Sequence, residues 1–598
     1  MFNWVVFMKT VCESYVFDRV DELLNSEEIY IVGEGECAEL SKKLLNKCID
    51  GNMYGDKRPI IRHCRREDGC VEDKTDSCSI DDLLKRDNSA SGLILCQNYE
   101  KSDRLTVNLI KSGFKNIITG KKMINCWYKE VWFFVNDLEE KSIPNDEEDV
   151  DIKNFLQTLK DKKSPDEYIK AANCFEKKGN YLLAYDYCLR GERISDDDAL
   201  KATRQRLEAT IERKSIDLSD YADALDKYIT LPYFGRSGSI YFQSLLEGHS
   251  KLFTIPPGII YFPYYNLYSL FLAGKGNVEV DEIVNALDLD DSPQEDYQEA
   301  VNITTKEGKE IYPEGFREKY RSFLERIIRN RLKHDDFLKE KFLIQAVFLA
   351  YNLALGRTID FKEGIPYITN HMHTSDFELE AKFLNMFSDT TVICTTRSLV
   401  QNFGSNIALY IRMFDKEMAK LKIMDLFFYY FIHPIFKKIG KDYKIYWAKL
   451  ECMNERPRDL LQNVTKLLDI DWEDSLEEST INGTKMYDNY ESGAKFHNGP
   501  RMIGIVKTYE EYLDAFDRYR LEVLYRPFLT MCDYPSTDYT DAEFLKNTSD
   551  VPFRFERKLS FKDEGERKKY RDRIRRFVLN IADKTNDADI GAKGCMVL

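Results

Sequence analysis

Apolar residues along this chain gather in short runs, and amphipathic segments with helical spacing lie between those runs. The runs predict strands at 29–32, 92–96, 116–118, 228–234, 366–368 and 391–394. Strands that alternate with helices indicate parallel sheets, because a helix is the usual connection between parallel neighbours. We therefore expect an α/β fold in which parallel sheets are flanked by helices.

The pattern divides the chain into four parts. Residues 26–140 open with a strand, a glycine turn and a helix, and they resemble the small Rossmann-like domain of many bacterial glycan-modifying enzymes. Residues 150–222 are predicted to be a helical spacer with tetratricopeptide-like (TPR-like) spacing, although one copy of that repeat does not form a solenoid. Residues 226–550 would form the main α/β domain, with a helical insertion at about 278–355, followed by a charged C-terminal tail at 551–598.

The composition serves mainly to exclude classes of function. The 87 Lys and Arg against 102 Asp and Glu give a net charge of −15, which argues against a protein that coats nucleic acid. The 14 cysteines are scattered singly, and we recognise no secretory leader. Apolar runs fall well short of the roughly 18 residues that span a bilayer. We therefore expect a reduced, cytoplasmic protein without stable membrane insertion.

The clearest candidate for chemistry is a glycine loop between a predicted strand and a predicted helix, Gly235-Arg236-Ser237-Gly238-Ser239-Ile240-Tyr241. Glycines let the backbone curl, so that successive N–H groups at the helix N-terminus point at one anion. Arg236 adds positive charge, and Ser237 and Ser239 add hydroxyl donors. The spacing of a Walker loop is missing, which disfavours ATP hydrolysis. An ordinary turn is the alternative interpretation.

A second candidate begins where the strand predicted at 391–394 ends. Arg397 follows that strand, and Ser405 lies eight residues further along the chain. If a helix starts between them, Ser405 faces back over Arg397, and both side chains can hold one phosphate. An exposed arginine and a mid-helix serine are the alternative.

Together these two features resemble the sulfotransferases that use 3′-phosphoadenylyl sulfate (PAPS) as donor. In that family the first loop binds the 5′-phosphosulfate, and a strand-end arginine with a serine eight residues later binds the 3′-phosphate. The resemblance spans about 226–534 and implies a P-loop-like parallel sheet. It implies cofactor-binding roles for Arg236, Ser237, Gly238, Ser239, Ile240, Tyr241, Arg397 and Ser405.

The chain also departs from the pattern of this family. Ile240 stands where a Thr or Ser often adds a hydroxyl to the phosphosulfate site. The family's C-terminal cofactor loop is matched only by 495–501, in which Arg501 is a candidate for the 3′-phosphate, with a plain surface loop as the alternative.

Glu451, by contrast, agrees with the family pattern, because it fits the carboxylate that follows the family's next strand.

Sulfuryl transfer needs a base for the acceptor oxygen and positive charge for the leaving phosphate. Arg236 would supply that charge as a catalytic residue. The resemblance places a basic histidine after the strand at 366–368, where His371 and His373 stand. We expect His371 to be the general base, with His373 next and Asp376 as a third candidate. A structural histidine is the alternative for either.

Three weaker motifs complete the survey. We predict no metal site, because His63, Cys64, Cys70 and Cys78 are irregularly spaced and His371-x-His373 lacks a second ligand cluster. The Gly33-x-Gly35-x-x-Ala38 pattern fits a nucleotide-binding turn, but its acidic ribose partner is not clearly placed. The sequence 595–598 has the form of a prenylation box, which we interpret as coincidence.

The sequence therefore predicts a metal-independent sulfotransferase that moves a sulfuryl group from PAPS to a hydroxyl or amine and releases adenosine 3′,5′-bisphosphate. The resemblance of the N-terminal domain favours a carbohydrate or glycolipid as the acceptor. One alternative is another P-loop-like phosphoryl or nucleotidyl transferase, which would need magnesium. The other is a non-catalytic TPR-type binding protein with a degenerate sulfotransferase domain.

Overall fold

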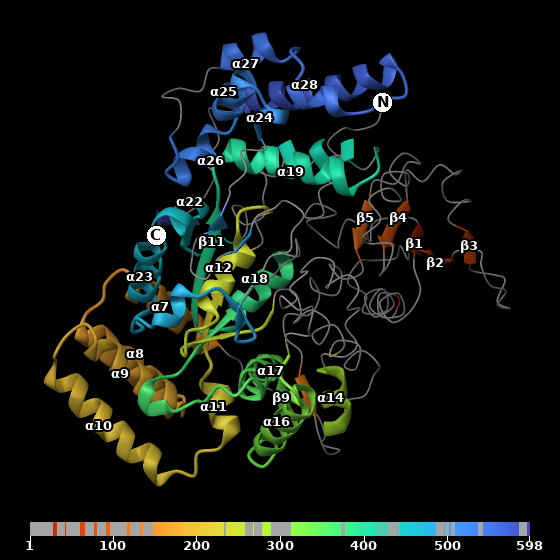
Figure 1. The fold of residues 1–598 in the computed structure, drawn as a ribbon. Helices are drawn as coiled ribbons and strands as arrows, with labels where there is room; N and C mark the ends of the chain where they lie inside the picture. Colours follow the sequence, from red (N-terminus) through yellow and green to blue (C-terminus); the bar gives the residue numbers. More distant parts are fainter. Residues whose placement is uncertain are drawn as a thin grey trace.

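The fold is known from a computed structural model (Figure 1). Before residue 147 it describes 28–32, 42, 60–65, 77–79, 91–95, 116–119 and 132–134. From 147 to 598 it describes the chain except for 233–234, 257–266, 268–277, 289–311, 336, 372–376, 417–418, 421, 425, 428–438, 440–442, 486–494, 497–501, 504–508, 536–541 and 585–594.

Five short strands near the N-terminus form one parallel sheet in the order β3-β2-β1-β4-β5. They are β1 (Glu28–Val32), β2 (Ile60–Arg65), β3 (Ser77–Ser79), β4 (Ser91–Leu95) and β5 (Asn116–Thr119). β1, β4 and β5 lie where the apolar runs predict strands. The segments that join them lie outside the described residues, so the Rossmann-like assignment stays a prediction.

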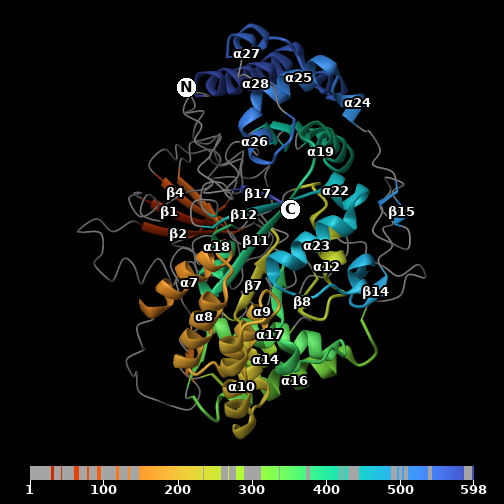
Figure 2. The same cartoon turned by 90° about the vertical axis from the view of Figure 1, so that its left-hand side faces the viewer.

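Six parallel strands form the larger sheet, in the order β17-β12-β11-β7-β10-β8 (Figure 2). They are β7 (Lys227–Thr230), β8 (Leu252–Thr254), β10 (Tyr367–Asn370), β11 (Asp389–Thr396), β12 (Ile445–Lys449) and β17 (Cys595–Val597). The predicted α/β class with parallel sheets is confirmed. Strand β7 ends at Thr230, earlier than predicted, and Pro232 just beyond it has no N–H to extend the strand pairing.

Helices cover both sides of this sheet. They include α12 (Ser239–Leu246), α18 (Phe377–Met386), α22 (Leu450–Glu455) and α23 (Pro457–Leu468). Helix α19 (Leu399–Met413) lies beyond the end of β11, next to the C-terminal helices (Figure 1). Helix α17 (Glu340–Ala354) falls in the segment expected as an insertion, yet nearly all of its side chains are buried. Its run of apolar residues packs against β8 and α16 (Phe316–Arg331), so α17 belongs to the core of the domain.

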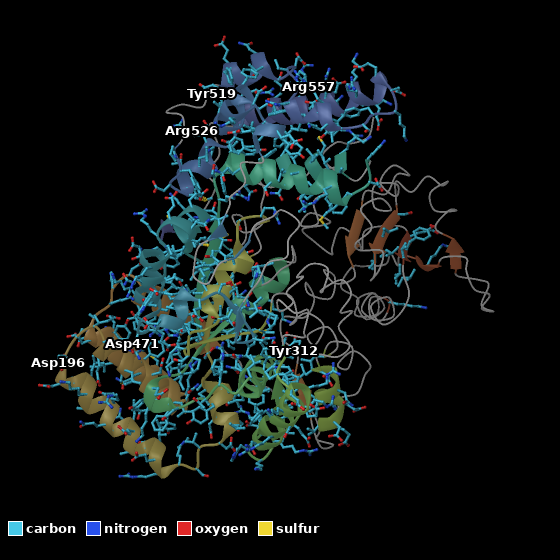
Figure 3. The ribbon with its side chains drawn as sticks, in the orientation of Figure 1. Asp196, Tyr312, Asp471, Tyr519, Arg526 and Arg557 are labelled. Atoms are coloured by element: carbon cyan, nitrogen blue, oxygen red, sulfur yellow. The ribbon has the colours of Figure 1, made fainter. Side chains whose placement is uncertain are left out.

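The segment expected as a charged tail also joins the core. Phe553, Phe555 and Phe577 surround Phe427, with ring centroids 5.2, 6.2 and 5.9 Å away. The last of these rings belongs to α28 (Glu564–Lys584), which lies with α25 (Ala515–Leu524) and α27 (Ala542–Thr548) in a layer above α19 (Figure 1). Tyr519 marks this layer in Figure 3 and packs on Phe544, with ring centroids 5.0 Å apart. Aromatic residues spaced among the charges explain the burial.

The edge strand of the larger sheet comes from the same C-terminal segment. Cys595, Met596 and Val597 pair with Ile445, Tyr446 and Trp447 of β12, and the Leu598 N–H donates to the Trp447 carbonyl over 2.9 Å. The backbone of the formal prenylation box is therefore engaged in the sheet, as Figure 2 shows beside the C-terminus.

The predicted spacer consists of helices joined by short turns. It comprises α7 (Glu147–Leu159), α8 (Pro165–Lys177), α9 (Tyr181–Glu192), α10 (Asp198–Arg213) and α11 (Leu218–Ala224). Gly179 makes the tight turn between α8 and α9 with a φ of 80°. The tetratricopeptide resemblance itself stays a prediction.

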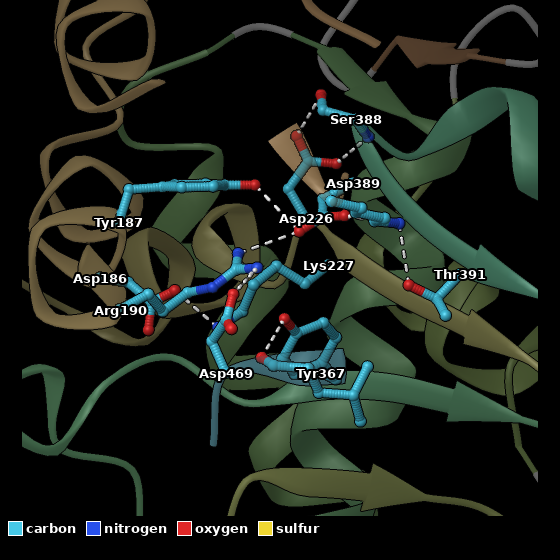
Figure 4. A network of polar contacts seen from close by, with 12 residues as sticks. Asp186, Tyr187, Arg190, Asp226, Lys227, Tyr367, Ser388, Asp389, Thr391 and Asp469 are labelled. Carbon is cyan, nitrogen blue, oxygen red and sulfur yellow. Dashed lines mark hydrogen bonds and ion pairs between the residues drawn. The ribbon is translucent and has the colours of Figure 1, made fainter. Parts of the chain in front are cut away.

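A buried ionic network fastens α9 to the larger sheet (Figure 4). Arg190 contacts Asp389 at the start of β11 over 3.0 Å and Asp469 after α23 over 3.2 Å. Lys160 lies 3.1 Å from the second Asp389 oxygen, and the Tyr187 hydroxyl donates to Asp389 over 3.0 Å. Burial acts to raise the pKa of Asp389, but Lys160 and Arg190 outweigh it and hold that pKa well below its usual range.

We expect Arg190→Met to lower the free energy of unfolding by about 3–5 kcal/mol, because it leaves two buried carboxylates short of a partner. Arg206→Met is the matched control on α10. It removes the exposed pair with Glu176, which is worth about 0–1 kcal/mol. Urea unfolding of both variants measures the difference, and equal losses would contradict a structural role for the network.

Candidate functional site

The candidate residues meet at one edge of the larger sheet. Because its strands are parallel, the segments that follow their carboxyl ends share that edge. The glycine loop follows β7, His371 follows β10, and Arg397 follows β11. Residues far apart in the sequence are thus brought to one edge of the sheet.

The glycine loop curls at the start of α12. Arg236 and Gly238 both have a left-handed backbone, with φ of 61° and 88°. Ser237 is fully buried, and its Oγ lies 2.6 Å from Thr395 Oγ1 of β11. A side chain at Gly238 would place its Cβ 2.6 Å from Leu450 Cδ1. This geometry requires glycine at 238, where the loop joins the start of α12.

Contacts between the loop and α19 bring the two anion-binding candidates together. Arg236 Nε donates to Ser405 Oγ over 3.3 Å, and the Gly235 carbonyl accepts from Asn402 Nδ2 over 2.9 Å. Asn402 and Ser405 lie on the first two turns of α19 and are both buried. The helix predicted to begin between Arg397 and Ser405 is observed, and it starts at Leu399.

The turn that carries Arg397 is held by a carboxylate. Glu451 of α22 accepts from the Ser398 N–H over 2.8 Å and from the Tyr534 hydroxyl over 2.8 Å. Burial, with Glu451 adding to it, raises the pKa of Tyr534 far above its usual range, so this hydroxyl keeps its proton. Arg397 itself is half-buried and donates to Gln401 over 3.2 Å. Sequence reasoning missed Tyr534, which no motif marks.

His371 is completely buried, and Gln243 of α12 determines which ring nitrogen carries its proton. Gln243 Nε2 donates to the Ile255 carbonyl over 2.8 Å, so its Oε1 faces His371 Nδ1 at 3.2 Å and must accept. Nδ1 therefore carries a proton, and in a neutral imidazole Nε2 would carry the lone pair. Sequence reasoning missed Gln243; its place one turn after Ser239 was the available signal.

The other predicted residues fall in different surroundings. Tyr241 is buried in the apolar core with Leu245 and Ile393, and burial raises its pKa. Ile240 is half-buried and, like Gln243, lines a small pocket. Ser239 is buried at the first turn of α12. The remaining predicted residues lie outside the described part of the chain: His373, Asp376 and Arg501.

Two searches of the described residues bear on metals and membranes. Among these residues, no group of three or more His, Cys, Asp or Glu is arranged to hold a metal ion. No helix in the described part of the chain is long and apolar enough to cross a bilayer.

Comparison with known proteins found limited similarity. No protein-family model and no curated protein matches the sequence. The sulfotransferase domain of the olefin synthase from Synechococcus PCC 7002 is 16% identical, with 43% of this chain and 77% of that domain covered and a TM-score of 0.23. Sulfotransferase STF9 from Mycobacterium avium is 14% identical, with 52% and 85% covered and a TM-score of 0.23. These values assign no family, so we argue the function from the site.

We expect Gly238→Ala to lower the free energy of unfolding by about 1–3 kcal/mol more than Gly179→Ala does, because only the first places a Cβ against Leu450. Both glycines have a positive φ, and a Cβ at Gly179 meets nothing within 4 Å among the described residues. Gly179→Ala should therefore lose only the backbone term of about 1–2 kcal/mol. Chemical denaturation compares the pair, and equal losses argue against the close approach of Leu450.

Proposed function

We propose that this protein is a sulfotransferase that moves a sulfuryl group from PAPS to a hydroxyl or amine. One observation carries the proposal: Arg236 of the glycine loop reaches Ser405 of α19, so that two anion-binding elements converge. A donor with two separate phosphate groups needs two such elements side by side. A single-phosphate ligand needs only one of them.

The residues of the two elements suit such a donor. The glycine loop offers backbone N–H groups at the start of α12, together with Arg236 and Ser239, for the phosphosulfate end. Arg397 and Ser405 would hold the 3′-phosphate, and Arg236 would exchange its bond to Ser405 for the anion. When bound, PAPS supplies the activated sulfuryl group and a phosphate leaving group. The charge of Arg236 would stabilise that leaving phosphate.

On the acceptor side, His371 would take the proton. Its Nε2 is the nitrogen that can accept, because Gln243 keeps the proton on Nδ1. Gln243 is in this view a positioning residue, which holds the imidazole through its bond to the Ile255 carbonyl. A carbohydrate or glycolipid remains the acceptor that we propose.

We expect adenosine 3′,5′-bisphosphate to bind in calorimetry without magnesium, and adenosine 5′-monophosphate to bind much more weakly. Arg397→Ala should weaken the first ligand by about 1.5–3 kcal/mol, roughly 10- to 100-fold, as one charge-assisted hydrogen bond contributes. Arg412→Ala, on the exposed last turn of α19, is the matched control and should change nothing. Equal affinity for both nucleotides would contradict a binding site for the 3′-phosphate. Tight ATP binding that requires magnesium would favour a phosphoryl or nucleotidyl transferase.

We expect His371→Ala to lower turnover by about 10²–10⁴-fold while nucleotide affinity stays intact, because the imidazole serves the acceptor. The fully buried His249, which contacts the Asp471 carbonyl, provides a control: His249→Ala should cost stability and leave turnover per folded molecule near normal. Gln243→Glu should raise the pKa of His371 and move the acid limb of the pH–rate profile upward. Full activity of His371→Ala would move the base to His373 or Asp376.

A further inference from the structure

A small pocket is lined in part by Gln243, whose side chain also contacts His371. Its walls come from α12, the end of β8 and strand β13 (Thr480–Ile481), and they include Ile240, Gln243, Glu247, Pro256, Ile481 and Asn482. The pocket holds about 250 Å³ of empty space, part of it open to solvent. Only about 10 Å³ can hold the centre of a water-sized group, so the pocket is narrow.

Asn482 presents a hydrogen-bond donor at this pocket. Its side chain is only 7% exposed, and its Oδ1 accepts from the Tyr351 hydroxyl over 2.8 Å. Its Nδ2 has no hydrogen-bond partner among the described residues. A buried amide N–H without a partner costs about 1–3 kcal/mol, so a ligand oxygen here would recover that energy.

Glu247 supplies the complementary acceptor. Its carboxylate accepts from Thr480 Oγ1 over 2.6 Å and from the Gly483 N–H over 3.1 Å. Its Oε1 also pairs with Arg357 over 3.5 Å, and its Oε2 has a further lone pair. None of the described residues that line the pocket carries a positive charge. Arg357, which pairs with Glu247, is not among the lining residues, so an anionic ligand would meet the carboxylate and no cation. A hydroxyl suits the pocket better, because it can donate to Glu247 and accept from Asn482.

We propose that this pocket binds a neutral hydroxymethyl group of the acceptor. The inference rests on the proposed function, because it takes the molecule that reacts at His371 to be the one that fills the pocket. Gln243 touches both places, so one hydroxyl of a polyol sits between Asn482 and Glu247 while another faces His371. The apolar walls at Ile240, Pro256 and Ile481 exclude a second polar substituent, and the narrow interior excludes a sugar ring.

The test uses the full chain and saturation-transfer NMR with three probes: methyl glucoside, its 6-deoxy analogue and glucuronate. The saturation-transfer signal of methyl glucoside is expected to exceed the signals of the other two probes. The 6-deoxy analogue lacks the hydroxyl, and glucuronate has a carboxylate in its place. Asn482→Asp keeps an oxygen that accepts from the Tyr351 hydroxyl but replaces the Nδ2 donor with a second oxygen. Methyl glucoside should therefore bind roughly three- to tenfold more weakly. Asn330→Asp is the matched control, at the same 7% exposure on α16, and should bind like the unaltered protein.

Asn482 has a φ of 52°, which glycine tolerates, so Asn482→Gly removes the amide if the aspartate variant does not fold. Equal transfer to all three probes, or an unchanged affinity in both Asn482 variants, would overturn the subsite. Because the measurement needs no donor, its failure is separable from that of the proposed function. If methyl glucoside binds and adenosine 3′,5′-bisphosphate does not, the pocket proposal stands and the sulfotransferase proposal is wrong. If the nucleotide binds and methyl glucoside does not, only the pocket proposal is wrong.

Discussion

Asp389 keeps its charge inside the protein, and much of the larger domain is arranged around that requirement. An isolated carboxylate would be too costly to bury, so Arg190, Lys160 and the Tyr187 hydroxyl surround it. These partners come from the helices that precede the sheet in the sequence. The helical spacer is therefore bound to the start of β11 by charge as well as by apolar packing. Removing the spacer would leave β11 with an uncompensated charge.

The same strand connects this network to the candidate site. β11 begins at Asp389 and ends at Thr396, one residue before Arg397, and its Thr395 contacts Ser237 of the glycine loop. Beyond the strand, Glu451 holds the Ser398 N–H, which sets the direction in which α19 leaves the sheet. The relative placement of Arg236 and Ser405 thus depends on a strand whose opposite end is anchored by buried ion pairs.

Local patterns in the sequence predicted several of the strands and the helix that follows the glycine loop. The apolar runs predicted β7, β10 and β11, and the glycine spacing predicted the turn into α12. The sequence did not reveal Gln243, Tyr534 or Asn482, because each acts through a partner distant in the chain. It also suggested a charged tail at 551–598, because the abundant charges of α28 obscured the aromatic residues that enter the core. Contacts between residues that are distant in the chain produce no periodic pattern of hydrophobic residues in the sequence.

Strand β17 has a consequence for how the sheet is assembled. Its partner β12 is made long before residues 595–597, so during synthesis one edge of β12 has unpaired backbone groups next to the large side chain of Trp447. Such an edge is open to pairing with strands of other chains until its own partner arrives. Late closure of this edge makes the nascent protein a candidate for chaperone protection, and it makes solubility during expression depend on the last few residues of the sheet.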